Sequence, residues 1–186
     1  MKHIAIVITA FLLQQHTQAQ TEVIRIKAGE NISSTLSAYG KYRFTHFKQG
    51  RLYYAYGKKA DASFNYNYLL EEMQFIDAKS GDTLAIANPE QVRFLLFDSA
   101  AFYYNEGFME LAADYDSVKI AMRQKLKISY EKIGAYGQPN NSSAIDNNKT
   151  YADKSGVVNL TINQDAVIKK EVTWYLITGD NERPVR

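Results

Sequence analysis

Few side chains in this sequence are suited to catalysis on their own. The chain has no cysteine and three histidines, of which only His46 lies beyond residue 20. The absence of cysteine excludes disulfides, thiolate metal sites and a thiol nucleophile. His46 shares one face of an alternating stretch with Tyr42 and Phe44, which is typical of a core or rim residue rather than of a catalytic base. No Gly-x-Ser-x-Gly motif is present, so the sequence predicts no catalytic triad.

Carboxylates are the remaining catalytic candidates. A pair of Asp or Glu side chains hydrolyses glycosides without any histidine, and the candidates are Glu71, Glu72, Glu106 and Glu110. The acidic clusters at 114–117 (DYDS) and 146–148 (DNN) lack the glycine and terminal glutamate of a calcium loop. Glycine-rich phosphate-binding motifs are absent. We therefore expect neither a metal nor a cofactor, and we keep a carboxylate-based, glycosidase-like hydrolase as the alternative function.

Tyrosine is the residue type that most suggests binding. The chain has 14 tyrosines and 9 phenylalanines, and a tyrosine ring offers rigid area with a hydroxyl, which suits glycan or protein contact. The same rings also fill cores and form cross-strand pairs, so that alternative stays open. Neighbouring rings on a strand point to opposite faces. The candidate ligand or partner residues are Tyr53, Tyr54, Tyr66, Tyr68, Tyr103 and Tyr104.

A basic stripe is the second candidate surface. Alternation from Val118 to Tyr130 places four cations on one side: Lys119, Arg123, Lys125 and Lys127. This stripe either contacts an anion, such as a lipid headgroup or polysaccharide, or is a solvated face that discourages edge pairing. The net charge is only +2, so the sequence as a whole gives no indication of nucleic-acid binding.

Period-two patterns predict the elements that position these residues. From Val118 to Tyr130 the even residues are apolar except Gln124, which indicates a strand with one wet face and a bend or bulge at Gln124. Gln49 and Gly50 read as a hairpin turn. The other expected strands cover residues 22–27, 41–48, 51–56, 63–77 with a kink, 83–87, 93–97, 101–104, 108–112, 157–162 and 167–178.

Ten or more short strands predict an all-β fold. Short connections favour an antiparallel meander. Because a twisted sheet of this size tends to curl or split, we expect the meander to close into a barrel-like or two-layer sandwich body.

The domain organisation follows from the ends and one polar segment. Residues 1–19 have the basic start, ten-residue apolar run and small residues before a cut after Ala19 that are typical of a signal peptide. We expect residues 20–186 to form a single β-rich domain with no transmembrane segment and a flexible loop at about 134–156. Export places the protein in the periplasm, on the outer envelope or outside the cell.

The stretch from Phe64 to Asn88 carries a family resemblance. Its elements Asn65-Tyr66-Asn67, Glu72-Met73 and Gly81-Asp82-Thr83-Leu84 resemble those of secreted bacterial proteins of unknown function, and the resemblance extends to about residue 130. It implies an exported bacterial protein and no site residue. We therefore expect a non-enzymatic envelope or secreted module that binds a partner protein, a glycan or a small apolar ligand.

Overall fold

The fold is one antiparallel sheet. The computed structural model describes residues 23–31, 35–36, 40–97, 99–115, 118–133, 139–145, 165–178 and 181–185, with the backbone alone for 131–133, 139–145 and 181–185. The strands are β1 (Val23–Ile26), β2 (Lys48–Tyr54), β3 (Lys59–Asn67), β4 (Glu72–Ile76), β5 (Thr83–Ala85), β6 (Val92–Phe97), β7 (Ala101–Tyr104), β8 (Phe108–Tyr115), β9 (Val118–Ile133), β10 (Pro139–Ile145), β11 (Ala166–Thr178) and β12 (Asn181–Val185). A 3₁₀ helix, η1 (Pro89–Gln91), precedes β6.

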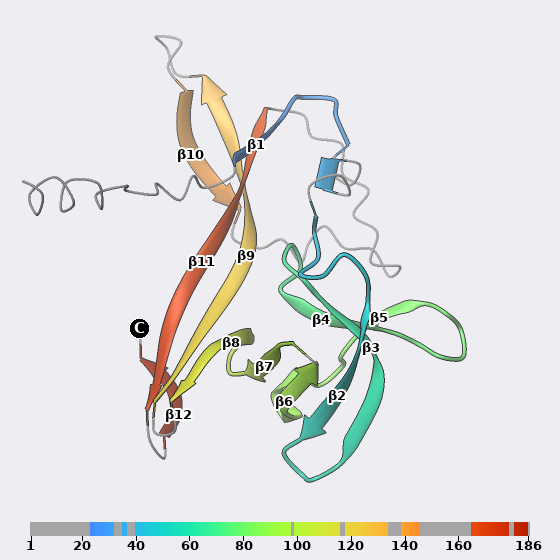
Figure 1. Cartoon of the computed structure of the whole chain (residues 1–186). Coiled ribbons are helices and arrows are strands. Elements are labelled where there is room, and N and C mark those ends of the chain that lie inside the picture. The colour runs from blue at the N-terminus through green and yellow to red at the C-terminus, as the bar shows by residue number, and fades with distance from the viewer. Residues whose placement is uncertain are drawn as a thin grey trace, which may run out of the picture.

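Two meanders are joined side by side. The strand order is β1-β11-β9-β8-β7-β6-β2-β3-β4-β5, with β10 paired to β9 and β12 paired to β11 outside this path. The prediction of an all-β antiparallel meander is confirmed. After β5 the chain returns through η1, so that β6 pairs with β2 rather than with β5. In Figure 1, β9 and β11 run side by side as the longest ribbons, with β10 near one end and β12 near the other.

The sheet does not close into a barrel, which corrects that part of the prediction. Strands β1 and β5 end the order, and no described residues pair them with each other. Nor does the arrangement of the described strands establish a sandwich or a barrel-like body. The turn between β3 and β4 reaches β9, where the backbone N–H of Leu126 donates to the carbonyl of Tyr68 at 2.9 Å.

The core is centred on this β3–β4 turn. Each residue from 65 to 70 is at most 5% exposed, although a hairpin turn ordinarily lies at the surface. Aromatic rings surround it, with the Tyr66 centroid 5.8 Å from that of Phe102 and 6.4 Å from that of Phe108. Glu71, at the end of the turn, has a φ of 55°, a left-handed conformation that non-glycine residues seldom adopt.

Two local predictions are wrong. Gly50 is not in a turn but inside β2, opposite Ala62 on β3 and Phe97 on β6. A Cβ at Gly50 would lie 3.0 Å from the Leu96 carbonyl oxygen, so glycine serves here for close approach of backbones. Residues 41–47 form no strand and contribute one isolated bridge, between Tyr42 and Asn67.

Strand β9 has no bulge at Gln124. Its pairing with β11 runs without a register shift from Val118 to Tyr130. The Gln124 side chain is buried and donates to Glu110. The irregularity lies instead in β8, between Leu111 and Ala113.

Several sequence predictions lie outside the described residues. These are the signal peptide at 1–19 and the strand at 157–162. Of the predicted loop at 134–156, residues 139–145 form β10 and the rest lie outside the described residues. Among the described residues, no helix is long and apolar enough to cross a membrane.

Candidate ligand-binding groove

An apolar groove of about 780 Å³ lies on one face of β2–β5. Cross-strand pairing explains its lining, because directly paired residues share a face of the sheet. Leu52 pairs with Ala60, and Phe75 pairs with both Phe64 and Leu84. The further apolar residues along the groove are Tyr54, Tyr56, Ala62, Ile76, Ala78, Ala85, Ile86 and Ala87.

The alanines determine the depth of the groove. Ala60 and Ala62 lie on the same face of β3 as Phe64 and carry only a methyl group each. Large side chains at these positions would fill the space between Tyr54 and Phe75. The groove is therefore a consequence of small residues flanked by aromatic ones, which is a common composition of small-ligand sites.

Two stacked rings form one wall. The centroids of Tyr54 and Tyr56 are 5.1 Å apart with an interplanar angle of 24°, and Tyr56 is 56% exposed. Burial raises the pKa of Tyr54, with a smaller contribution from Tyr56, so this hydroxyl stays neutral at physiological pH. The ammonium of Lys58 lies 5.8 Å from the Tyr56 centroid. An exposed, flat and partly polar wall of this kind suits stacking against a planar apolar ligand face.

The acidic groups at the groove already have partners. The Arg51 guanidinium donates to both oxygens of Asp61, at 2.7 and 3.0 Å, and this hydrogen bonding lowers the Asp61 pKa. Asp77 accepts from the backbone and hydroxyl of Ser80, at 3.1 and 3.0 Å, which lowers its pKa. Both carboxylates are therefore ionised at neutral pH, and neither is poised to donate a proton.

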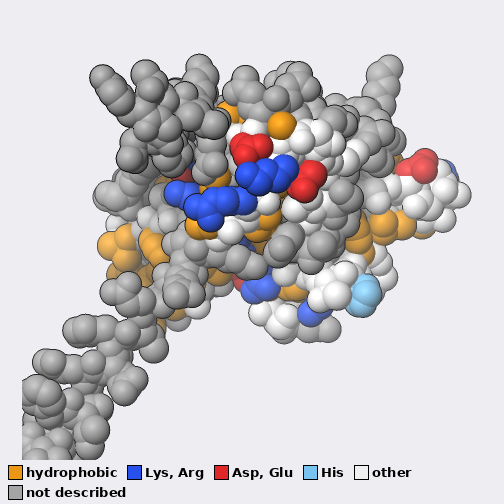
Figure 2. Space-filling model, turned by 90° about the horizontal axis from the view of Figure 1, so that it is seen from above, with side chains coloured by type: hydrophobic (Ala, Val, Ile, Leu, Met, Phe, Trp, Pro, Cys, Tyr) orange, Lys and Arg blue, Asp and Glu red, His pale blue; other side chains and the backbone are white. Residues whose placement is uncertain are grey.

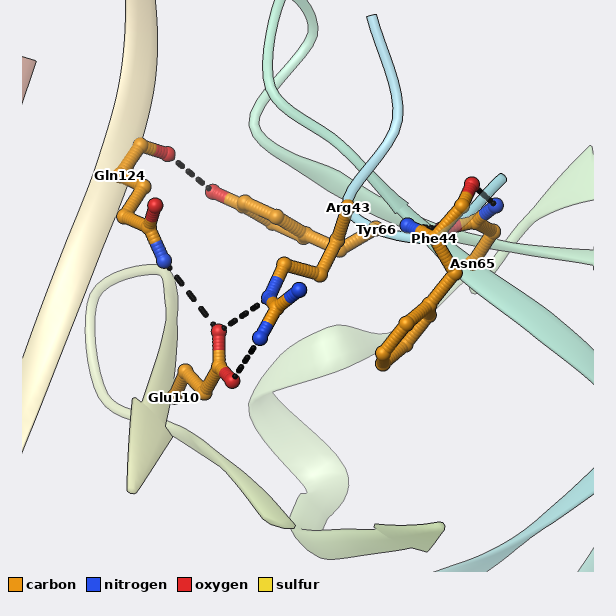
Figure 3. A network of polar contacts seen from close by, with 6 residues as sticks. All are labelled: Arg43, Phe44, Asn65, Tyr66, Glu110 and Gln124. Carbon is orange, nitrogen blue, oxygen red and sulfur yellow. Dashed lines mark hydrogen bonds and ion pairs between the residues drawn. The ribbon is translucent and has the colours of Figure 1, made fainter. Parts of the chain in front are cut away.

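A buried polar network lies in the packed centre, away from the groove (Figure 3). Arg43 donates from Nε and an Nη to the two oxygens of Glu110, at 2.8 and 2.9 Å, and Gln124 donates to the same carboxylate at 3.2 Å. The Tyr66 hydroxyl donates to the Gln124 carbonyl at 3.2 Å. Bonding to Glu110 raises the pKa of Arg43. Because both Glu110 oxygens are engaged, this catalytic candidate is held as a structural ion pair.

The six candidate tyrosines do not form one cluster. Tyr54 lines the groove, Tyr66 and Tyr68 are buried in the centre, and Tyr104 packs against the core. Tyr53 and Tyr103 lie on the opposite face, where each ring neighbours Phe94, at 4.4 and 6.4 Å between centroids. The neighbouring pairs thus divide between the two sheet faces, as alternation requires. Their role in binding stays a prediction.

The basic stripe does lie on one face of β9, and Lys119, Arg123 and Lys127 are engaged. Lys119 pairs with Asp114 at 2.6 Å and Lys127 with Glu171 at 3.4 Å. Arg123 donates to the Asn105 carbonyl at 2.6 Å and lies 5.2 Å from the Tyr175 centroid. Lys125 pairs in register with Glu171. Figure 2 shows Lys or Arg side chains beside Asp or Glu side chains on the face seen from above. A role of the stripe in anion contact stays a prediction.

Neither the arrangement of possible metal ligands nor comparison with known proteins assigns a function to the described residues. No group of three His, Asp or Glu side chains in the described part of the chain is arranged to hold a metal ion, and His46 is exposed. Comparison with protein-family models, curated proteins and solved structures finds no significant match.

Sequence reasoning found one groove residue, Tyr54, and missed most of the others. Phe75 and Leu84 lie in predicted strands but are not among the predicted binding residues, because nothing in their local pattern says which strands pair. A signal was present in the alternating alanines from Ala60 to Ala62, which leave one face of an aromatic strand without large side chains. That signal becomes informative once the register of β3 is known.

Proposed function

We propose that this protein is an exported binding protein that holds a small ligand with a flat, largely apolar face in the groove of β2–β5. The observation that carries the proposal is the combination of an alanine floor with the exposed Tyr54–Tyr56 stack. A ligand that enters there buries apolar surface without displacing a charge, since Asp61 and Asp77 keep their own partners. Hydrophobic burial is then the main source of affinity.

Selectivity comes from the polar rim. Gln49, Asn88 and Gln91 line the groove. A side-chain amide has one acceptor and two donors, and the Gln49 amide already uses one donor on the Ser63 hydroxyl at 2.8 Å. They can orient a ligand that carries a hydroxyl or carbonyl at its edge. A fully charged ligand would lose hydration without meeting an unpaired opposite charge, so the groove favours neutral molecules.

Export is supported by the N-terminal sequence. The predicted signal peptide ends at Ala19, and a cysteine-free domain folds equally well in an oxidising compartment. Expression of the full chain in a bacterial host should give a periplasmic or secreted product that begins at Gln20. Recovery of the full-length chain from the cytoplasm would contradict this part of the proposal.

Ligand binding is tested with the neutral fluorescent probe N-phenyl-1-naphthylamine, whose aromatic rings offer the required face. We expect Tyr56→Ser and Leu84→Ser to weaken probe binding about tenfold each, because each removes apolar contact area. The matched controls are Tyr115→Ser and Leu96→Ser, at positions exposed to a similar degree but outside the groove. Equal losses in both pairs would mean that the probe reports general surface hydrophobicity.

A variant that fills the groove gives an independent check of the binding site. Ala62→Leu places a branched side chain on the groove floor and should abolish probe binding while circular dichroism stays unchanged. A folded Ala62→Leu protein that binds the probe normally would remove the groove from consideration.

A further inference from the structure

The segment of β9 from Val118 to Arg123 has one charged face and one uncharged face. Alternation places Lys119 and Arg123 on the first face. It places Val118, Ile120 and Met122 on the second. An apolar strand face of this kind is stable only when something covers it, because apolar surface is unfavourable in water.

Cross-strand pairing extends the apolar row over three strands. Ile120 is opposite Ala113 on β8 and opposite Leu176 on β11. Directly paired residues share a face of the sheet, and residues two positions along share it as well. We call this surface the Trp174 face, and its members are Ala113, Tyr115, Val118, Ile120, Met122, Val172, Trp174 and Leu176.

The same side of β9 is covered in one half and open in the other. Leu126 and Ile128 lie on it as well and are buried in the main core. In the Trp174 face, by contrast, Tyr115 is 66% exposed, Trp174 57% and Leu176 44%. A contiguous apolar patch on a folded domain marks an interaction surface.

The charged groups at the border of the Trp174 face are engaged in the fold. Glu110, the register partner of Met122, is buried and accepts from Arg43 at 2.8 Å. At the opposite border, the Lys170 ammonium lies 4.0 Å from the ring centroid of Tyr68. The occupant of the face must therefore be uncharged as well, because a buried charge without a partner is costly.

We propose that the protein forms a weak two-fold dimer in which the Trp174 faces of two copies pack on one another. This interface is separate from the groove and does not depend on it. A second copy meets the requirement for an uncharged partner, because a two-fold axis places the same patch on both sides of the contact. Two sheets that pack face to face in this way form a two-layer arrangement.

The area of the face agrees with a weak dimer. Because aromatic side chains offer roughly 150–250 Å² each, the exposed parts of Trp174 and Tyr115 supply about 250 Å². The aliphatic members supply a similar area. Two copies would then bury about 1,000 Å² in total, which is the lower limit of a specific interface. We expect a dissociation constant of about 10 µM, so the monomer prevails at 1 µM and below.

Sedimentation velocity of the purified protein tests the dimer. Between about 1 and 300 µM, on either side of the expected constant, the average mass should rise from that of one chain toward that of two. Trp174 is the only tryptophan, and its emission should move to shorter wavelength over the same range as the indole is buried. A protein that stays monomeric at the highest concentration would overturn the proposal.

Two matched variants test the location of the interface. Leu176→Lys places a charge on the Trp174 face and should weaken the dimer about tenfold or more. Leu96→Lys, at a leucine that is 39% exposed outside the face, should leave it unchanged. Equal weakening by both variants would overturn the assignment of the face. If circular dichroism shows that Leu176→Lys is unfolded, Trp174→Ala serves in its place with the same expectation.

Neutral lipid vesicles test the other occupant that an uncharged apolar face suits, because tryptophan is common at membrane interfaces. Phosphatidylcholine vesicles added to the monomer, at about 1 µM protein, should leave the Trp174 emission unchanged. A shift to shorter wavelength with vesicles, in a protein that does not dimerise, would assign the face to a lipid surface and overturn the proposal.

Discussion

Both outer edges of the β9–β11 pair present backbone N–H and C=O groups, and the described residues treat the two edges differently. In this ladder, the Gln124 carbonyl on β9 accepts from the buried β3–β4 turn, and Val172 on β11 is the register partner of Gln124. On the first side, a tyrosine hydroxyl and a tyrosine carbonyl satisfy the β9 backbone. On the second side, β1 pairs with residues 166–169 of β11, and β12 pairs with residues 176 and 178. The β9 edge is thus closed by buried polar partners that the sequence supplies.

Closing an edge with a turn demands that the turn satisfy its own backbone. The Asn67 side-chain oxygen accepts from the N–H groups of Leu69 and Leu70, at 3.0 and 3.2 Å. The Asn65 amide bonds both the N–H and the carbonyl of Phe44, at 3.0 and 2.8 Å. Because a buried polar group without a partner costs roughly 1–3 kcal/mol, these asparagines are what allow a turn to lie in the core.

The largest expected effect is a difference in side-chain packing between the β3–β4 turn at the β9 edge and the outer edge of β11. Leu69→Ala empties a side-chain site in the β3–β4 turn that is 0% exposed, and should lower the free energy of unfolding by about 2–5 kcal/mol. Val172→Ala, at the exposed edge, should lower it by less than about 1 kcal/mol. Urea unfolding followed by circular dichroism measures both. Similar losses would mean that the β11 edge is packed as tightly as the β9 edge.

The next effect compares two ion pairs of the same geometry. Glu110→Ala leaves Arg43 and Gln124 without their acceptor in the centre, and should cost about 2–3 kcal/mol, below the value for a fully buried pair because Arg43 is 34% exposed. Asp61→Ala breaks the bidentate pair with Arg51, which lies open to solvent, and should leave urea stability unchanged. An equal response would show that burial does not distinguish these pairs.

The sequence predicted which residues form strands better than it predicted which strands pair with one another. The β7 boundaries and the strand character of β6, β8, β9 and β11 follow from period-two patterns, which are local. The filling of the β9 edge by the Asn65–Leu70 segment depends on residues some 60 positions apart, so no local pattern contains it. Gly50 was misread because glycine serves equally in turns and at close backbone approach. The groove was only partly predicted, since it depends on the register between β3, β4 and β5.

A smaller effect isolates the single bond between the turn and β9. Tyr66→Phe removes the hydroxyl that donates to the Gln124 carbonyl, in a ring that is 2% exposed. The expected loss is about 1 kcal/mol, the net contribution of one neutral hydrogen bond. Tyr115→Phe, at a side chain that is 66% exposed, serves as the control and should change nothing. If Tyr66→Phe is neutral, the Leu126–Tyr68 backbone bond alone joins the turn to the strand.

The smallest expected effect appears only in alkaline solution. It tests whether water reaches the β3–β4 turn at the β9 edge. Burial raises the pKa of Tyr68 to about 12, and burial likewise raises that of Tyr66, whereas an unfolded tyrosine has a pKa of about 10. Below pH 10 both states hold these protons, so the stability is independent of the two groups. Between pH 10 and 12 the unfolded state loses them first, and the free energy of unfolding falls as the pH rises. Tyr68→Phe should make that decline shallower, as measured by urea unfolding at pH 9, 10.5 and 11.5. The exposed Tyr115→Phe should leave the decline as it is, and an unchanged decline in Tyr68→Phe would show that water reaches the turn.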